Sequence, residues 1–226
     1  MSDRLKFMPA RVKTAVRPRL AILLVHGMGV GPDWWYPIAS SLRRFRVTVR
    51  ALKMPSLETA GPAAWCVAIL RELPRGPAIL VGHSLGAAVC LEVGRRRRVE
   101  GLVMLACPPF FADFTPPEPP ETDLSAGALR RVARFLRRVC QRAGAPPGHS
   151  VHFVGTADPW VPVPQARRLP VPLVAIPGAG HALNRSPRLV KKLARQLILS
   201  GATKRSSRKA QLNQRQAAKL PGRKAG

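Results

Sequence analysis

Acidic residues are scarce in this chain. Only 11 of its 226 residues are Asp or Glu, against 38 Lys or Arg, which leaves a formal net charge of +27 at neutral pH. Such an excess points to an anionic partner, either a nucleic acid or an acidic membrane surface, but says nothing about the fold. Arg supplies 29 of the basic residues, and Ala and Pro are also abundant. A GC-rich genome is therefore a second explanation for the charge.

Cysteine is infrequent too, and its spacing argues against two classes of small protein. The chain has four cysteines: Cys66, Cys90, Cys107 and Cys140. None of them is in C-x-x-C spacing, and three of the four lie inside apolar runs. This pattern does not fit a zinc-binding module or a disulfide framework. It predicts reduced, buried thiols and a cytoplasmic location.

Long hydrophobic runs and phosphate-binding fingerprints are also missing. The longest apolar run near the start covers residues 20–25, which is too short for a signal-peptide core or a membrane span. The sequence contains neither G-x-G-x-x-G nor G-x-x-x-x-G-K-[ST]. A nucleotide-dependent oxidoreductase is therefore disfavoured, and we expect no organic cofactor and no metal.

What the chain does contain is an alternation of apolar runs and helix-like segments between residues 19 and 199. The runs are rich in Val, Ile and Leu without polar alternation, which is typical of strands buried on both faces. We expect strands over 20–25, 46–51, 78–81, 101–105, 150–154 and 173–176, and helices over 34–43, 62–72, 85–96, 125–141 and 187–199. The prediction is an α/β fold, with a mostly parallel sheet of about six strands and helices on both faces.

Three segments do not fit this alternation. Residues 1–18 are basic and aperiodic and are expected to form a flexible arm. Residues 108–123 hold six prolines after an expected strand, and are interpreted as a minimal lid or, equally, as a stiff connector. Residues 200–226 carry eight basic residues and no acidic side chain, and predict a disordered tail. This tail is either a solvated extension or a non-specific contact for an anionic partner.

A G-x-S-x-G pattern joins the third expected strand to the following helix. It consists of Gly82, Ser84 and Gly86. This spacing is typical of a nucleophile elbow, a sharp turn in which the serine is strained and bulkier neighbours would collide. Taken alone, the pattern is also compatible with a small-residue turn that has no chemistry. Its position between a strand and a helix favours Ser84 as a nucleophile.

A serine nucleophile needs a base and a carboxylate that orients the base. On a sheet of this kind they follow the serine in the order carboxylate, then histidine. Asp158 directly follows the fifth expected strand, and His181 lies in a glycine-containing loop after the last one. His181 is also the only histidine beyond Asp158. The sequence therefore predicts a triad of Ser84, Asp158 and His181.

The glycine-rich loop after the first strand is the candidate for the second half of an oxyanion hole. The backbone N–H groups of Met28 in this loop and Leu85 in the elbow are the predicted donors. His26, at the start of the loop, is interpreted as structural. Four aromatic residues are candidates for a substrate pocket, with core and lid packing as the alternative: Trp34, Trp35, Phe110 and Trp160.

These residues resemble the α/β-hydrolase superfamily over roughly residues 19–199. A narrower resemblance is to the small YdeN-like group that includes retinoblastoma-binding protein nine. It rests on Trp34-Trp35, Met54-Pro55, Trp65, Asp158-Pro159 and Val161-Pro162. The segment His26-Gly27-Met28-Gly29 is closer to the general hydrolase pattern than to that group. The resemblance implies a compact serine hydrolase that acts on acyl esters through Ser84, Asp158 and His181.

The predicted function is cleavage of a carboxylic ester, or a related acyl bond, through an acyl-enzyme. A short or medium acyl chain is the default, and amides, thioesters and lactones stay open. The alternative is a catalytically idle hydrolase fold that uses its basic tails to bind nucleic acid or anionic surfaces. Retention on DNA that depends on salt and on residues 200–226 would support this alternative.

Overall fold

The computed structural model of the protein describes residues 20–42, 45, 47–111, 113, 122–142, 146–147, 149–185, 189 and 192. The predicted arm over 1–18, the tail over 200–226 and most of the segments 108–123 and 187–199 lie outside these residues. The predictions made for them therefore stay predictions.

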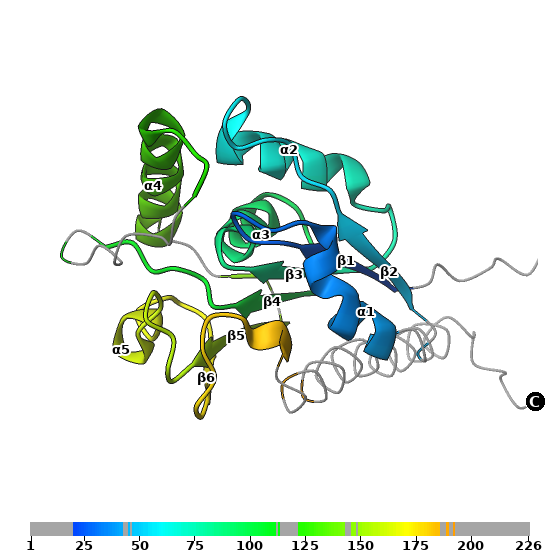
Figure 1. Ribbon diagram of the computed structural model, residues 1–226. Coiled ribbons are helices and arrows are strands. Elements are labelled where there is room, and N and C mark those ends of the chain that lie inside the picture. Colours follow the sequence, from blue (N-terminus) through cyan, green and yellow to red (C-terminus); the bar gives the residue numbers. More distant parts are fainter. Residues whose placement is uncertain are drawn as a thin grey trace, which may run out of the picture.

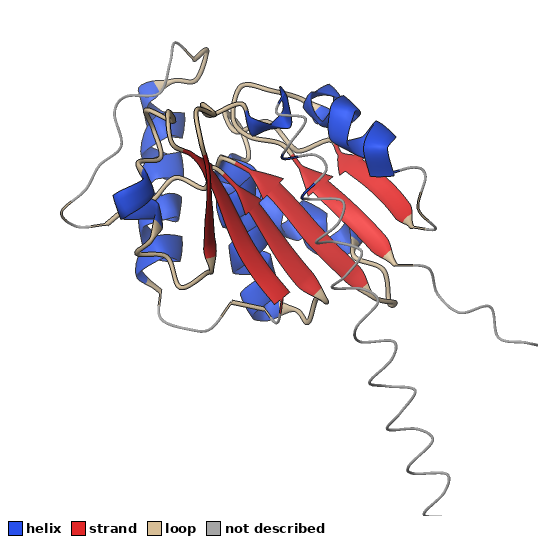
Figure 2. Cartoon of the chain, turned by 90° about the horizontal axis from the view of Figure 1, so that it is seen from below, coloured by secondary structure: helices blue, strands red, loops and turns tan. Residues whose placement is uncertain are grey.

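The centre of the described part is a single parallel sheet of six strands in the order β2-β1-β3-β4-β5-β6. The strands are β1 (Ala21–Val25), β2 (Thr48–Leu52), β3 (Ala78–His83), β4 (Gly101–Leu105), β5 (His149–Gly155) and β6 (Leu173–Ile176). Figure 2 shows them side by side, progressively twisted and covered by helices. Because all are parallel, their carboxyl ends meet at one edge of the sheet, where the loops after β1, β3, β5 and β6 begin.

Helices cover both faces of this sheet (Figure 1). They are η1 (Pro32–Trp35), α1 (Tyr36–Leu42), α2 (Gly61–Glu72), α3 (Leu85–Arg96), α4 (Ala126–Gln141), α5 (Val163–Ala166) and η2 (Leu183–Arg185). α2, α3 and α4 form the layer on one side, and η1, α1, α5 and η2 lie on the other. The α/β-hydrolase fold expected from the sequence is confirmed.

Two hydrophobic cores follow from this layering. Alternate side chains of a strand point to opposite faces, so Leu23 and Leu80 join the core under α2–α4, whereas Ile22 and Ile79 join the core under α1. β1, β3 and β4 are buried along their whole length. This explains why their sequences lack polar alternation.

The four cysteines are buried and unbridged, as predicted. Burial raises the pKa of the Cys66 thiol to about 11, which leaves it protonated at neutral pH. Within the ranges that the structure describes, no helix is long and apolar enough to cross a membrane.

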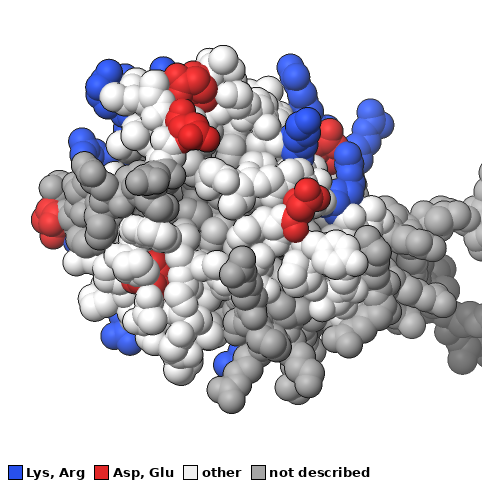
Figure 3. Space-filling model, viewed as in Figure 1, with Lys and Arg blue, Asp and Glu red and all other residues white. Residues whose placement is uncertain are grey.

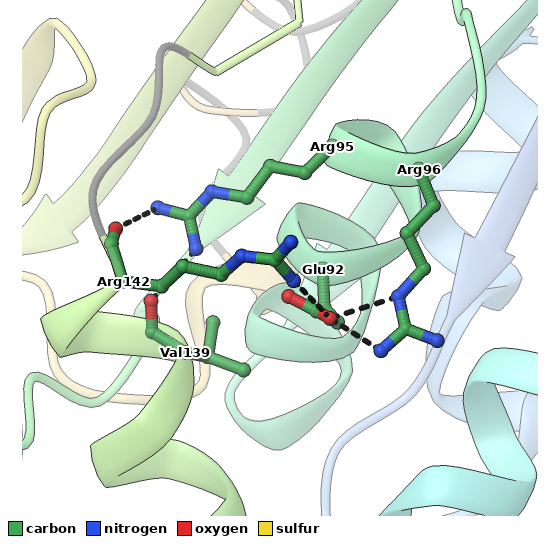
Figure 4. A network of polar contacts seen from close by, with 5 residues as sticks. All are labelled: Glu92, Arg95, Arg96, Val139 and Arg142. Atoms are coloured by element: carbon green, nitrogen blue, oxygen red, sulfur yellow. Dashed lines mark hydrogen bonds and ion pairs between the residues drawn. The ribbon is translucent and has the colours of Figure 1, made fainter.

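A buried carboxylate ties α3 to α4 (Figure 4). Glu92 of α3 is only 1% exposed, and its Oε1 accepts hydrogen bonds from Arg96 at 2.8 Å (Nε) and from Arg142 at 2.9 Å (Nη1). Arg95 donates to the carbonyl oxygens of Val139 (2.8 Å) and Arg142 (3.1 Å). Both carbonyls belong to the C-terminal end of α4, where the helix leaves such groups without internal partners.

Candidate active site

Ser84 forms the turn between β3 and α3. Its backbone angles are φ 51° and ψ −124°, in a region that residues with a side chain rarely adopt. The Ser84 N–H donates to the carbonyl oxygen of Leu105 in the adjacent strand β4, at 2.8 Å. The strained turn is thus fixed to the middle of the sheet, as the G-x-S-x-G pattern indicates.

Close backbone contacts explain the two glycines that flank this turn. A Cβ atom at position 82 would lie 2.6 Å from the nitrogen of Ala87, and one at position 86 would lie 3.0 Å from the carbonyl carbon of Val25. Neither position has room for a side chain. α3 therefore begins directly after Ser84 and packs closely against β1 and β3 only because both residues are glycine.

Asp158 and His181 are brought together at the same edge of the sheet. Asp158 follows β5 and is 6% exposed. Its Oδ1 accepts hydrogen bonds from the backbone N–H groups of Trp160 (2.9 Å) and Val161 (3.1 Å). Its Oδ2 lies 2.8 Å from Nδ1 of His181. Since a carboxylate accepts, Nδ1 carries the proton and Nε2 is left with a lone pair.

His83, the residue before Ser84, links the elbow to the loop that carries His181. Nε2 of His83 donates to the carbonyl oxygen of His181 at 3.1 Å, so the elbow itself holds the loop after β6. Within the described residues, no hydrogen bond joins the Ser84 hydroxyl to the His181 ring. Hydrogen bonds of this kind are often long in ligand-free sites and shorten when substrate binds.

Both predicted oxyanion donors border Ser84. Leu85 is the first residue of α3, so its N–H has no acceptor within the helix. Met28 follows Gly27, where a Cβ atom would lie 3.0 Å from Cβ of Ser84. The loop after β1 therefore packs directly against the elbow. The assignment of the Met28 and Leu85 N–H groups as oxyanion donors stays a prediction.

The four aromatic candidates for the pocket have separate surroundings. Trp160 meets His181 edge to face, with ring centroids 4.9 Å apart, and Trp34 stacks on His83 at 4.0 Å. Trp35 is fully buried in the core on the α1 side, so it packs the core and does not wall a pocket. Phe110 packs against the opposite core. Trp35 and Phe110 therefore pack against the cores, which is the alternative given for them above.

A cavity of about 470 Å³ opens beside the loop after β1. It is lined by His26, Gly27, residues 29–31, 54–57 and 122–124, and Trp65. Within the described part of the chain, none of the four predicted pocket aromatics belongs to this lining. The walls instead come from the segments that precede α2 and α4, far apart in the sequence.

Three buried histidines surround this edge of the sheet, and burial favours their neutral form. Burial, together with the neighbouring His181, lowers the pKa of His83 to about 3. Burial alone lowers the pKa of His152 to about 3, and it lowers the pKa of His26 as well. His83 is therefore neutral at neutral pH, and its single ring proton is the one donated to His181.

Comparison with known proteins identifies the family of this chain. Residues 22–144 match the model of the alpha/beta hydrolase family, and this match covers more than half of the chain. The chain belongs to the alpha/beta hydrolase family. The superfamily predicted from the sequence is thus confirmed.

Individual relatives of this α/β-hydrolase are more distant. It is 36% identical over 101 residues to a pimeloyl-[acyl-carrier protein] methyl ester esterase from Aromatoleum aromaticum, covering 40% of this chain and 38% of the relative. The chain spans half or less of the length of the curated relatives it matches.

Solved structures share its fold at low identity. A monoacylglycerol lipase from Paleococcus ferrophilus has a TM-score of 0.64 at 18% identity, over 79% of this chain and 92% of the lipase. A putative YdeN-like hydrolase from Pectobacterium atrosepticum has a TM-score of 0.54 at 22% identity, over 80% and 92% of the two chains. These likenesses show the fold alone, so the narrower YdeN-like resemblance stays a prediction.

Sequence reasoning missed two contributors to the site of this α/β-hydrolase. His83 was treated only as the variable residue of G-x-S-x-G, although a histidine next to a candidate nucleophile is a signal in itself. Asn184 in η2 donates to the carbonyl oxygen of Trp34 at 2.6 Å, which fixes the segment after His181 to η1. No local pattern marks this contact, because its partners lie 150 residues apart.

Proposed function

We propose that this α/β-hydrolase is a serine hydrolase that cleaves a carboxylic ester through an acyl-enzyme intermediate. The observation that carries the proposal is the 2.8 Å contact between His181 Nδ1 and Asp158 Oδ2 beside the strained Ser84 turn. A buried carboxylate that fixes the tautomer of a histidine, next to a strained and partly buried serine, suits acyl transfer.

In the first half of the reaction, His181 Nε2 accepts the Ser84 proton while Oγ forms a bond to the ester carbonyl carbon. The carbonyl electron pair moves to its oxygen, which the N–H groups of Met28 and Leu85 stabilise as an anion. Asp158 stabilises the imidazolium that results. The intermediate then expels the alcohol oxygen, which takes the proton from His181, and leaves an acyl group on Ser84.

In the second half, water replaces the alcohol. His181 accepts a proton from the water as its oxygen attacks the acyl carbon. The bond from the acyl carbon to Ser84 Oγ then breaks, and the proton returns from His181 to Ser84. The carboxylic acid leaves, and the enzyme regains its starting state. No step in this sequence requires a group beyond the side chains and backbone named here.

The ester as substrate class is supported by the relatives. Two curated relatives carry the name pimeloyl-[acyl-carrier protein] methyl ester esterase. The chain matches only part of these proteins, so the identity of their substrate is not transferred. What we transfer is the chemical class, a carboxylic ester, because this is the bond that a serine, histidine and carboxylate arrangement cleaves readily.

The test is steady-state hydrolysis of p-nitrophenyl esters by the purified protein. We expect turnover by the wild type, loss of at least a thousandfold in kcat for Ser84→Ala, and a similar loss for Asp158→Asn. Ser41→Ala is the control, since this serine is in α1 and its hydroxyl donates only to Pro37. Turnover by Ser84→Ala at the wild-type rate would contradict the proposal.

A further inference from the structure

We infer that the cavity beside the loop after β1 binds the acyl chain of the substrate, and that it accepts an uncharged chain and rejects one ending in a carboxylate. The inference rests on the proposed ester hydrolysis and names its substrate class. Three observations carry it: the contact between the cavity wall and Ser84, the core that its apolar lining residues join, and the charge of its lining.

The cavity wall touches the candidate nucleophile. Gly27 belongs to the lining, and a Cβ atom at this position would lie 3.0 Å from Cβ of Ser84. Met28, the predicted oxyanion donor, comes next in the chain. A carbonyl held between Ser84 Oγ and the Met28 N–H lies beside this wall, so the chain attached to it can extend into the cavity.

The apolar part of the cavity lining and the neighbours of His181 pack against different cores. Its apolar lining residues Met54, Leu57 and Trp65 belong to the core under α2, α3 and α4. Trp160 and Ala179, which flank His181, pack against the core on the α1 side. Because His181 must protonate the departing alcohol, the alcohol leaves on its own side. The acyl chain is left to extend toward the cavity.

The walls are fixed by internal hydrogen bonds. Trp65 Nε1 donates to the carbonyl oxygen of Pro55 at 2.7 Å, and its ring meets that of His26 edge to face at 5.1 Å. His26 Nδ1 donates to the carbonyl oxygen of Gly27 at 2.8 Å. These contacts hold the indole and imidazole rings in place in the cavity wall. A volume of about 470 Å³ is within the usual range for small-molecule sites.

The charge of the lining is opposite to that of the chain. Although the chain carries a net charge of +27, the only Asp, Glu, Lys or Arg among the described lining residues is Asp123. Glu58 lies next to the lining and accepts hydrogen bonds from Ser125. On the face drawn in Figure 3, acidic atoms lie between two groups of basic side chains. An acyl chain ending in a carboxylate would therefore approach like charge.

One described cation lies beside the lining without belonging to it. The Arg131 guanidinium donates to the backbone carbonyl of Glu58 at 2.5 Å and to that of the lining residue Leu57 at 3.4 Å. Hydrogen bonds from Ser125 are the main cause of the lowered pKa of the Glu58 carboxyl, and the nearby charge of Arg131 lowers it further. Glu58 thus stays ionised and adds to the negative field.

The first experiment compares two p-nitrophenyl esters of equal chain length, one ending in a methyl group and one in a carboxylate. We expect the wild type to favour the neutral ester by roughly tenfold or more in kcat/KM. Asp123→Asn is expected to narrow this ratio, because it removes the like charge. Glu72→Gln is the matched control: it also removes one carboxylate, but one at the end of α2 that pairs with Arg50, and the ratio should stay unchanged.

The second experiment fills the cavity. Gly31 lines it and has no atom within 4 Å of a Cβ position, so a side chain can begin there without a clash, and Gly31→Leu is chosen to take up space. We expect kcat/KM for the octanoyl ester to fall roughly tenfold relative to the acetyl ester. Gly127→Leu, in the first turn of α4 and outside the lining, is the control.

The outcomes separate the inference from the function it rests on. If no ester is cleaved by the folded wild type, the proposed function fails and the inference fails with it. If both esters are cleaved at equal rates and Asp123→Asn leaves their ratio unchanged, the charge selection is wrong while the hydrolase stands. If Gly31→Leu leaves the chain-length preference unchanged, the acyl chain does not occupy this cavity.

Discussion

At the scale of the residue, His83 connects the two halves of the candidate site. It is bonded covalently to Ser84, donates to the carbonyl of His181 at 3.1 Å and stacks against Trp34. Burial keeps it neutral, so it has one ring proton to donate. It touches no reacting atom in the proposed mechanism. Its role is to position His181, and small errors in such positioning are costly.

This role predicts different outcomes for two replacements of His83. His83→Leu removes the donor, and we expect kcat to fall roughly tenfold to a hundredfold with KM little changed. His83→Gln keeps an N–H within reach of the His181 carbonyl and should recover most of the rate. Steady-state kinetics and thermal unfolding of both variants provide the measurement. Equal loss of kcat in both, at equal Tm, would show that the hydrogen bond is not what matters.

A second residue-scale prediction concerns stability against pH. His152 Nε2 accepts the N–H of Cys107 at 3.0 Å, and burial lowers the pKa of His152 to about 3. An unfolded histidine has a pKa near 6.5. Between this value and about pH 3, the histidine is therefore protonated in the unfolded chain and neutral in the folded chain. Above pH 6.5 this histidine does not reduce the free energy of unfolding. As the pH falls below 6.5, the free energy of unfolding decreases by about 1.4 kcal/mol per pH unit for each such histidine.

The measurement is urea denaturation of wild type and His152→Gln at several pH values below neutrality. The wild type should lose stability more steeply than the variant, because Gln does not titrate. His149→Gln, at the exposed start of the same strand, is the matched control. Parallel curves for wild type and His152→Gln would contradict the prediction.

At the scale of the element, the expected strands correspond closely to the observed ones. Residues 101–105 and 173–176 match their strands in full, and the others differ by one or two residues at their ends. Strands buried on both faces leave a clear apolar run, and Ser125 caps α4 through a bond to the N–H of Ala128. The short helices α5 and η2 were not predicted, because helices of three or four residues leave no periodic pattern.

The contact between α3 and α4 supplies the prediction at this scale. Glu92 is buried, and Arg96 and Arg142 are its ion-pair partners. Replacing both by Met leaves a carboxylate with low solvent access, which should cost about 3 kcal/mol in the free energy of unfolding. Arg50→Met, which breaks an exposed ion pair with Glu72, should cost less than about 1 kcal/mol. Urea denaturation that gives equal values for the two variants would disprove the role of burial.

At the scale of the whole molecule, the sequence predicts what depends on order along the chain. The α/β-hydrolase fold, and the order of serine, carboxylate and histidine at strand ends, could be predicted because parallel strands bring their carboxyl ends to one edge. The cavity could not, because its walls come from segments before α2 and before α4 that meet only after folding. For the same reason the sequence left two alternatives open for the aromatic residues, pocket wall or core packing, and only the structure places Trp35 in the core.

The central claim is that Ser84 is a nucleophile activated by His181 and Asp158. Its most direct test is labelling of the folded wild type with a fluorophosphonate probe, followed by mass spectrometry of the modified peptide. The account predicts one probe per chain, attached to Ser84, and none on Ser84→Ala with an unchanged circular dichroism spectrum. A folded wild type that takes up no probe, or a Ser84→Ala variant labelled to the same extent, would contradict it.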